Sequence, residues 1–475
     1  MFDEPSNVLA GRYASDQMRA IWSPARRVVL ERRLWLAVLK AQQQLGVDVP
    51  EQVVQAYENV ADQVDLQSIA QRERTTRHDV KARIDEFCEL AGYQHIHKGM
   101  TSRDLTENVE QMQIRESLVL VRQRAVAALI RFGRRAAEFA DMPMTGRSHN
   151  VAAQVTTLGK RFANAAEELF TGVEHLEQLL ERYPLRGIKG PVGTQQDMLE
   201  LLDNARENLR ELEQRIARHL GFTRVLGAVG QVYPRSLDLE VVATLLQLAA
   251  GPCSFAKTLR LMAGQGLISE GFQPGQVGSS AMPHKVNART CERIGGLGHV
   301  LAGHVSMLAG ISGDQWNEGD VSCSVVRRVA IADAFFAMDG LLQNLLHVLD
   351  ELSVFPAQIR RELEDNLPFL ATSKVLIACV QRGLGRETAH ALIKEHALAA
   401  ARALRETGRD ELGLLARLAN DPRIPLDLDE LGGLLSQPID FVGTAVDQAR
   451  ALAQTVEQLA LKEPDAAAYV PAPLL

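Results

Sequence analysis

The chain has 475 residues, of which 46% are hydrophobic, and its 59 acidic and 52 basic side chains leave a net charge of −7. A chain of this size and composition can bury substantial cores, so we expect a soluble globular protein with two or three domains. The acidic balance provides no general attraction for nucleic acid, and an anionic ligand would have to be held by locally placed Arg and Lys.

The sequence also lacks the features of a membrane or secreted protein. No apolar run reaches the about 20 residues of a membrane span, and the N-terminus has neither the basic nor the apolar region of a signal peptide. The five cysteines show no CxxC or Cys/His spacing typical of a metal site: Cys88, Cys253, Cys291, Cys323 and Cys379. We therefore predict a cytoplasmic protein with buried thiols, no bound metal, and no nucleic-acid or membrane partner.

The periodicity predicts a nearly all-helical chain. Residues 28–46, VVLERRLWLAVLKAQQQLG, place Leu30, Leu34 and Val38 on one helical face before Gly46, which can end the helix. Longer helical windows follow at residues 108–140, 156–182, 196–220, 237–267 and 289–311. Because the average helix has about eleven or twelve residues, these lengths predict an extended bundle in which packing stabilises each helix.

Shorter helices follow Val354-Phe355-Pro356, and a last helix is expected near residues 440–461. We expect the tail, EPDAAAYVPAPLL, to lie as irregular chain on the surface. The predicted fold class is all-α, with three helical domains: an N-terminal domain (1–107), a central bundle of long helices (108–356) and a C-terminal domain (357–475).

Six polar segments interrupt the helical pattern: ERTTRHDVKA, HIHKGMTSRDLTE, MTGRSHNVAAQ, RGIKGPVGT, VGQVYPRS and GSSAMPHKVN. The last could be a simple connector, but its two Ser, His284, Lys285 and Asn287 favour a mobile loop that binds an anion and transfers protons. A serine is a poor base at neutral pH, so Ser279 would need its alkoxide stabilised by Lys285 or by backbone N–H groups. RGIKGPVGT matches no phosphate-binding motif, and we interpret it as a turn near the site.

GSSAMPHKVN resembles the GSxxMxxKxN signature of the fumarase, aspartase and argininosuccinate lyase superfamily. Within it, RYASDQMRAIW, TTRHDVKA, HKGMTSRDLTENV and QVYPRSLDLEVV are similar to segments of the adenylosuccinate lyase family. The resemblance covers the first three quarters of the chain and weakens after about Leu352. It implies a cofactor-free enzyme that eliminates fumarate from succinylated purine nucleotides, working as a homotetramer whose sites combine motifs from different subunits around a shared helical core.

The resemblance also implies roles for individual residues. Ser279 corresponds to the base that removes a proton beside a carboxylate, and Lys285 supplies a full positive charge. His149 is the expected acid, and Glu292 the carboxylate that orients it. His78 is a second active-site histidine. Substrate-binding roles fall on Arg12, Tyr13, Arg77, Asp79, His97, Thr101, Ser102, Gln231, Ser280, Met282, Asn287, Arg293, Ser324 and Arg328.

The sequence departs from the family pattern in three places. Ser148 and Asn150 replace the usual Thr and Gly around His149, and Ala288 replaces a proline. Gly319 stands where relatives commonly carry an arginine that contacts the substrate, and Arg327 is a candidate substitute.

Two other functions remain open from the sequence alone. Another lyase of the superfamily, such as an argininosuccinate lyase or a cycloisomerase, would share the chemistry of Ser279 and Lys285. A non-catalytic helical scaffold is possible because a fold does not dictate a function, although Ser279, Lys285 and His149 are all present.

Overall fold

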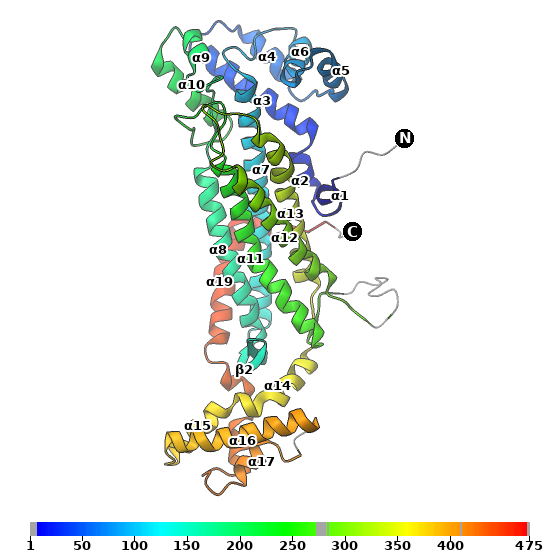
Figure 1. Ribbon diagram of the computed structural model, residues 1–475, viewed down its shortest axis with the longest axis vertical. Helices are drawn as coiled ribbons and strands as arrows, with labels where there is room; N and C mark the ends of the chain where they lie inside the picture. Colours follow the sequence, from blue (N-terminus) through cyan, green and yellow to red (C-terminus); the bar gives the residue numbers. More distant parts are fainter. Residues whose placement is uncertain (1–6, 272–281, 283–284, 409–410, 473–475) are drawn as a thin grey trace.

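The molecule is an elongated helical rod, as Figure 1 shows. This computed structural model describes residues 7–271, 282, 285–408 and 411–472. Six helices run along its length: α7 (Ser102–Glu138), α8 (Leu158–Arg182), α11 (Ser236–Gly264), α12 (Arg289–Ile311), α13 (Cys323–Glu351) and α19 (Ala445–Lys462). The 37 residues of α7 span about 55 Å at 1.5 Å per residue. The prediction of an all-α fold built on a long central bundle is confirmed.

One end of the rod is built from α3 (Pro24–Gln44), which has 21 residues, and from shorter helices (Figure 1). The shorter helices are α4 (Glu51–Val60), α5 (Leu66–Thr76), α6 (Asp79–Ala91), α9 (Gln196–Leu201) and α10 (Arg206–His219). Helices α1 (Val8–Arg12) and α2 (Asp16–Ile21) lie beside the bundle, where both contact α13. The prediction of one helix over residues 196–220 is wrong. Asp203 and Asn204 have φ angles of 53° and 60°, which break the helix, and α10 then packs on α3.

The opposite end carries a β-hairpin, β1 (Pro143–Ser148) and β2 (Val151–Thr157), and a group of helices with apolar cores of their own. These are α14 (Pro356–Leu370), α15 (Thr372–Gln381), α16 (Arg386–Thr407), α17 (Leu414–Ala419), α18 (Leu428–Leu434) and the 3-10 helix η1 (Pro438–Phe441). Two further strands, β3 (Ile268–Ser269) and β4 (Ser353–Val354), pair with each other. The segment MTGRSHNVAAQ therefore forms a hairpin rather than an irregular loop.

The segment 357–475 does not pack as one unit. Helix α19 returns to the central bundle and lies against α7 and α8. Gly133 of α7 permits this contact, because a Cβ at that position would lie only 2.7 Å from Cγ1 of Val456. After α20 (Pro464–Ala467), the carbonyl of Tyr469 accepts a 2.7 Å hydrogen bond from Arg131. The guanidinium of Arg124 stacks on the ring of Tyr469, so the tail is anchored to α7.

Helices α11, α12 and α13 are long and apolar enough, by length and composition, to cross a membrane. Within the described chain, 83% of the most apolar window of α13 is buried, but only 33% of that of α12. Val300 and Met307 on α12 are apolar and exposed, and Val325 on α13 is 70% exposed. The central bundle thus leaves apolar side chains uncovered. All five cysteines are free thiols: Cys291, Cys323 and Cys379 are buried as predicted, whereas Cys88 and Cys253 are half-buried.

Candidate active site

Three helices begin around one cavity of about 230 Å³: α6 at Asp79, α7 at Ser102 and α13 at Cys323. We call it the three-helix cavity. It is lined by the predicted site residues His78, Asp79, Ser102, Ser324 and Arg328, and by Arg27, Val80, Arg103, Thr106, Glu110 and Arg327. Helix N-termini carry unpaired N–H groups and partial positive charge, so three of them together with Arg103 and Arg328 favour an anionic ligand.

His78 is the N-cap of α6. Its Nδ1 accepts a 3.2 Å hydrogen bond from the backbone N–H of Lys81, so in the neutral ring Nε2 carries the proton. The side chain is 53% exposed and lies 3.7 Å from the carboxylate of Asp79. Arg77, which precedes it, adopts a left-handed φ of 50° and joins α5 to α6. Arg77 is not among the residues that line the three-helix cavity.

His97 and Thr101 lie on the loop that leads into α7. The indole N–H of Trp35 donates a 3.0 Å hydrogen bond to Nδ1 of His97. Burial lowers the pKa of His97, which keeps its ring neutral and able to accept this bond. The loop therefore enters α7 in a fixed position.

The start of α7 rests on a buried carboxylate. Asp104 accepts hydrogen bonds from the backbone N–H of Thr101 (2.8 Å), the guanidinium of Arg186 (2.6 Å) and the backbone N–H of Lys189 (2.7 Å). Arg186 also donates to the carbonyl of Gly230 at 3.0 Å. Residues 186–190 of the segment RGIKGPVGT thus form a buried turn that supports α7, whereas Pro191, Val192 and Thr194 are exposed.

Arg327 has a structural role instead of replacing the arginine absent at Gly319. Its Nε donates to Asp238 at 2.7 Å and its Nη1 to Glu110 at 2.6 Å, while Nη2 donates to the hydroxyl of Tyr233. Burial alone would raise the pKa of Glu110, but the positive charges of Arg327, Arg27 and Arg235 together outweigh burial and lower it. With its side chain only 4% exposed, Arg327 is committed to these partners.

Gln231 joins two loops near this end of the bundle. Its backbone N–H donates to the carbonyl of Glu318 at 2.6 Å, which ties VGQVYPRS to the segment that precedes α13. The sequence had assigned Gln231 to substrate binding, and that role stays a prediction.

A second cavity, of about 240 Å³, brings together the predicted residues Arg12, Tyr13 and Arg293. The buried carboxylate of Asp339 accepts a 2.6 Å hydrogen bond from the backbone N–H of Ser15 and so fixes the loop after α1. Sequence reasoning missed the other wall, to which Gln343 of α13 and Ala472 of the C-terminal tail contribute. No motif in the tail indicated this position.

His149 lies at the tip of the hairpin, at the other end of the rod. Ser148 pairs with Val151, so His149 and Asn150 form a two-residue turn, with φ angles of 51° and 62°. Both angles are those of a type I′ turn, which asparagine tolerates well, so Asn150 can replace the family's glycine. His149 is exposed.

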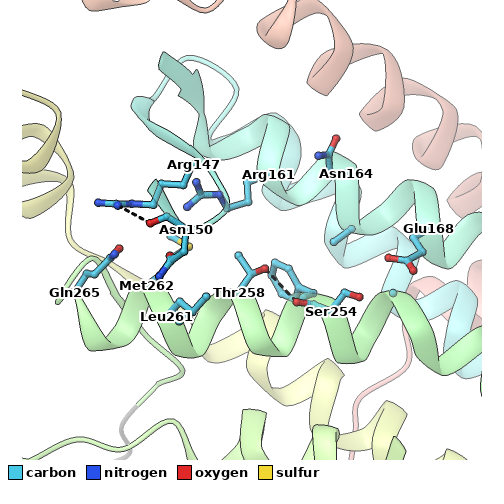
Figure 2. A pocket seen from close by; sticks show the side chains of 13 residues that line it. Arg147, Asn150, Arg161, Asn164, Glu168, Ser254, Thr258, Leu261, Met262 and Gln265 are labelled. Atoms are coloured by element: carbon cyan, nitrogen blue, oxygen red, sulfur yellow. Dashed lines mark hydrogen bonds between the residues drawn. The ribbon is translucent and has the colours of Figure 1, made fainter. Parts of the chain in front are cut away.

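A cavity of about 440 Å³ lies between the hairpin, α8 and α11 (Figure 2). Figure 2 shows Arg147 and Asn150 of the hairpin over α11, with Arg161 of α8 beside them. Arg147 donates to the carbonyl of Asn150 at 3.2 Å and forms an ion pair with Glu362 of α14. Burial lowers the pKa of Arg161. The ion pair with Glu362 holds the hairpin against α14, and Arg161 of α8 donates a 3.3 Å hydrogen bond to the carbonyl of Thr145 in β1.

Ser279 and Ser280 lie outside the described residues, but hydrogen bonds join Glu270, which precedes them in the chain, to the start of α12, which follows them. Glu270 accepts hydrogen bonds from the backbone N–H groups of Thr290 (2.8 Å) and Cys291 (2.9 Å), which caps the start of α12.

Of the predicted residues near Ser279, Met282, Lys285 and Asn287 precede α12 in the chain, and Glu292 lies on it. The backbone N–H of Lys285 donates to the carbonyl of Met282 at 3.0 Å, and Asn287 lies just before α12. Glu292, in the first turn of α12, is exposed and 3.5 Å from Arg260.

One copy of the chain cannot bring all predicted residues to one substrate. Ser102 lines the three-helix cavity at the beginning of α7, whereas the hairpin with His149 follows the end of the same helix. The length of α7 separates them by about 55 Å. The described residues contain no group of three His, Cys, Asp or Glu side chains placed to hold a metal ion.

Comparison with known proteins gives the family. Residues 11–303 match the lyase family, and residues 368–452 match the adenylosuccinate lyase C-terminus family. The adenylosuccinate lyase of Saccharomyces cerevisiae is 33% identical, with 95% of each chain covered. That of Schizosaccharomyces pombe is 31% identical, covering 93% of this chain and 92% of the relative.

Solved structures agree on the fold. A 3-carboxy-cis,cis-muconate lactonizing enzyme from Pseudomonas putida superposes with a TM-score of 0.80 at 21% identity, covering 95% of this chain and 99% of that one. At this identity the likeness concerns the fold alone. The sequence relatives decide the branch: the chain belongs to the lyase family and, within it, to the adenylosuccinate lyases.

Proposed function

We propose that this chain cleaves adenylosuccinate into AMP and fumarate. We further propose that it performs the same elimination on the succinylated imidazole carboxamide ribotide of purine synthesis. The observation that carries the proposal is the three-helix cavity, where His78, Ser102, Ser324 and Arg328 meet at three helix N-termini. Such a cavity suits a substrate that bears phosphate and carboxylate groups. Argininosuccinate has carboxylates but no phosphate, and the curated relatives favour the nucleotide.

The chemistry needs three groups. Ser279 would remove the proton from the carbon next to a carboxylate of the succinyl group, and Lys285 would stabilise the electron-rich carboxylate that results. The electron pair then forms the double bond of fumarate as the carbon–nitrogen bond breaks. His149, oriented by Glu292, would protonate the departing nitrogen, which becomes the amino group of AMP.

The active enzyme is proposed to be a homotetramer with composite sites. About 55 Å separate the three-helix cavity from the His149 hairpin, so a second copy, running antiparallel, would bring the two together. The apolar surface left uncovered on α12 and α13 supports burial against other copies. Ser280, Asn287 and Met282 would then meet the fumaryl part from a further copy.

Fumarate release from adenylosuccinate by the purified protein tests the proposal. We expect turnover far above the uncatalysed background, and a higher melting temperature in the presence of AMP because AMP binds only the folded state. Arginine and a muconate serve as controls that should leave the melting temperature unchanged. A folded tetramer that releases no fumarate would favour the scaffold alternative, and protection by arginine or muconate would favour another lyase.

A further inference from the structure

The arginines of the three-helix cavity differ in how firmly they are held. Arg327 is bound to Asp238, Glu110 and Tyr233. Arg328 is exposed and has no ion pair among the described residues. Arg103 is held less firmly than Arg327 and more firmly than Arg328. It lies on the first turn of α7, next to the predicted residue Ser102.

Arg103 has two contacts, and both are long. Its Nη1 is 3.3 Å from Oε1 of Glu107, and its Nη2 is 3.4 Å from Oγ of Ser324. Glu107 is already paired with Arg235, which donates to both carboxylate oxygens at 2.8 and 2.9 Å. The charge of Arg103 is therefore not needed to neutralise Glu107. Its Nε has no partner in the described part of the chain, and its side chain is 20% exposed.

One buried polar atom beside the same cavity also lacks a partner. Oγ1 of Thr106 is inaccessible and forms no hydrogen bond with a described residue, whereas Nε of Arg27 lies 3.5 Å from Oε1 of Glu31 in an ion pair. Buried polar groups are almost always hydrogen-bonded, so an unpaired one that lines a cavity indicates a ligand or water in it.

The loop before α13 cannot supply a further cation from position 319. Gly319 has a φ of 128°, which side-chain-bearing residues rarely adopt, and a Cβ there would lie 2.9 Å from Cγ2 of Val232. An arginine at this position would need a different loop. Arg103 reaches Ser324 from the opposite wall of the cavity, on α7.

We propose that Arg103 binds the phosphate of the nucleotide, together with Ser324 and Arg328, and supplies the guanidinium that Gly319 cannot. This inference rests on the proposed function. A phosphate monoester has three free oxygens and up to two charges, which match a planar guanidinium, a second arginine and the N–H groups of helix ends. A carboxylate of the succinyl group would use fewer of these donors.

Binding of AMP and of adenosine tests the assignment, because the two differ only in the phosphate. We expect Arg103→Gln to weaken AMP binding by about 10- to 100-fold while adenosine binding stays within about twofold of wild type, measured by titration calorimetry. Arg134→Gln is the matched control, since Arg134 is an exposed arginine at the far end of the same helix. It should leave AMP binding unchanged.

A second variant distinguishes a loss of phosphate binding from a loss of structure. Arg103→Lys keeps the charge but not the two-pronged geometry, so an intermediate loss of AMP affinity is expected. AMP affinity equal to wild type in Arg103→Gln, or an equal loss for adenosine, would overturn the role of Arg103.

These outcomes are separate from the test of the proposed function. A wild-type protein that cleaves adenylosuccinate while Arg103→Gln binds AMP normally rejects only Arg103. A wild-type protein that binds AMP through Arg103 but releases no fumarate rejects only the reaction.

Discussion

Replacing Ser279 by alanine is expected to lower kcat for adenylosuccinate by about 10²- to 10⁴-fold, the usual contribution of a positioned base. Alanine removes the hydroxyl and leaves the backbone of the motif unaltered. The substrate's phosphate and carboxylates would still find their partners, so KM should change much less than kcat. Fumarate release at saturating adenylosuccinate measures the effect, and the variant should assemble as the wild type does.

Ser436→Ala is the matched control, because Ser436 is an exposed serine in the end formed by α14–α18, where its hydroxyl contacts only the carbonyl of Gly433. Its kcat should equal that of wild type. Turnover by Ser279→Ala within a few-fold of wild type would show that another group removes the proton.

Replacing Asp104 by alanine is expected to destabilise the fold more than any surface change. The carboxylate is fully buried and accepts hydrogen bonds from Thr101, Arg186, Lys189 and Gly190. Its removal leaves the guanidinium of Arg186 buried without a counter-charge, which costs about 3–5 kcal/mol. A fall in melting temperature of about 3–5 °C should follow, because the unfolding entropy of a chain this long is about 1 kcal/mol/K.

Asp141→Ala provides the comparison, since the ion pair of Asp141 with Arg450 is exposed on both sides. Such pairs contribute about 0–1 kcal/mol, so this variant should melt close to wild type. Equal melting temperatures for the two variants would mean that the turn around Arg186 does not depend on Asp104.

Helix positions could be predicted where one periodic face is buried along the whole segment. The start and end of α12 were predicted to the residue, and α11 nearly so. The pattern failed at residues 202–205, because left-handed residues can interrupt a helix without a proline or glycine. It also could not show that α19 returns to the bundle, since an amphipathic helix does not reveal which neighbour covers its apolar face.

The candidate site was predicted in part. Motifs placed His78, Ser102, Ser324 and Arg328 in a common site, and the structure brings them to one cavity. Arg103 was missed although it follows Ser102 directly, because one more arginine at a helix start is usually a surface charge.

Arg327 was predicted to be a candidate substrate contact, because the sequence did not reveal its buried partners. Its partners Glu110 and Asp238 are 217 and 89 residues away in the chain, and only the fold brings them to it. Long-range pairs of this kind carry no local signal.

The claim on which the account depends is that one copy's three-helix cavity works with another copy's hairpin. Two inactive proteins test it: His149→Gln, and the double variant His78→Gln with Ser102→Ala. Each alone should release almost no fumarate from adenylosuccinate. After the two are mixed in equal amounts, dissociated and reassembled, about a quarter of the sites should combine an intact cavity with an intact hairpin, and about a quarter of wild-type turnover should return. Mixed tetramers that form but remain inactive would contradict the shared site.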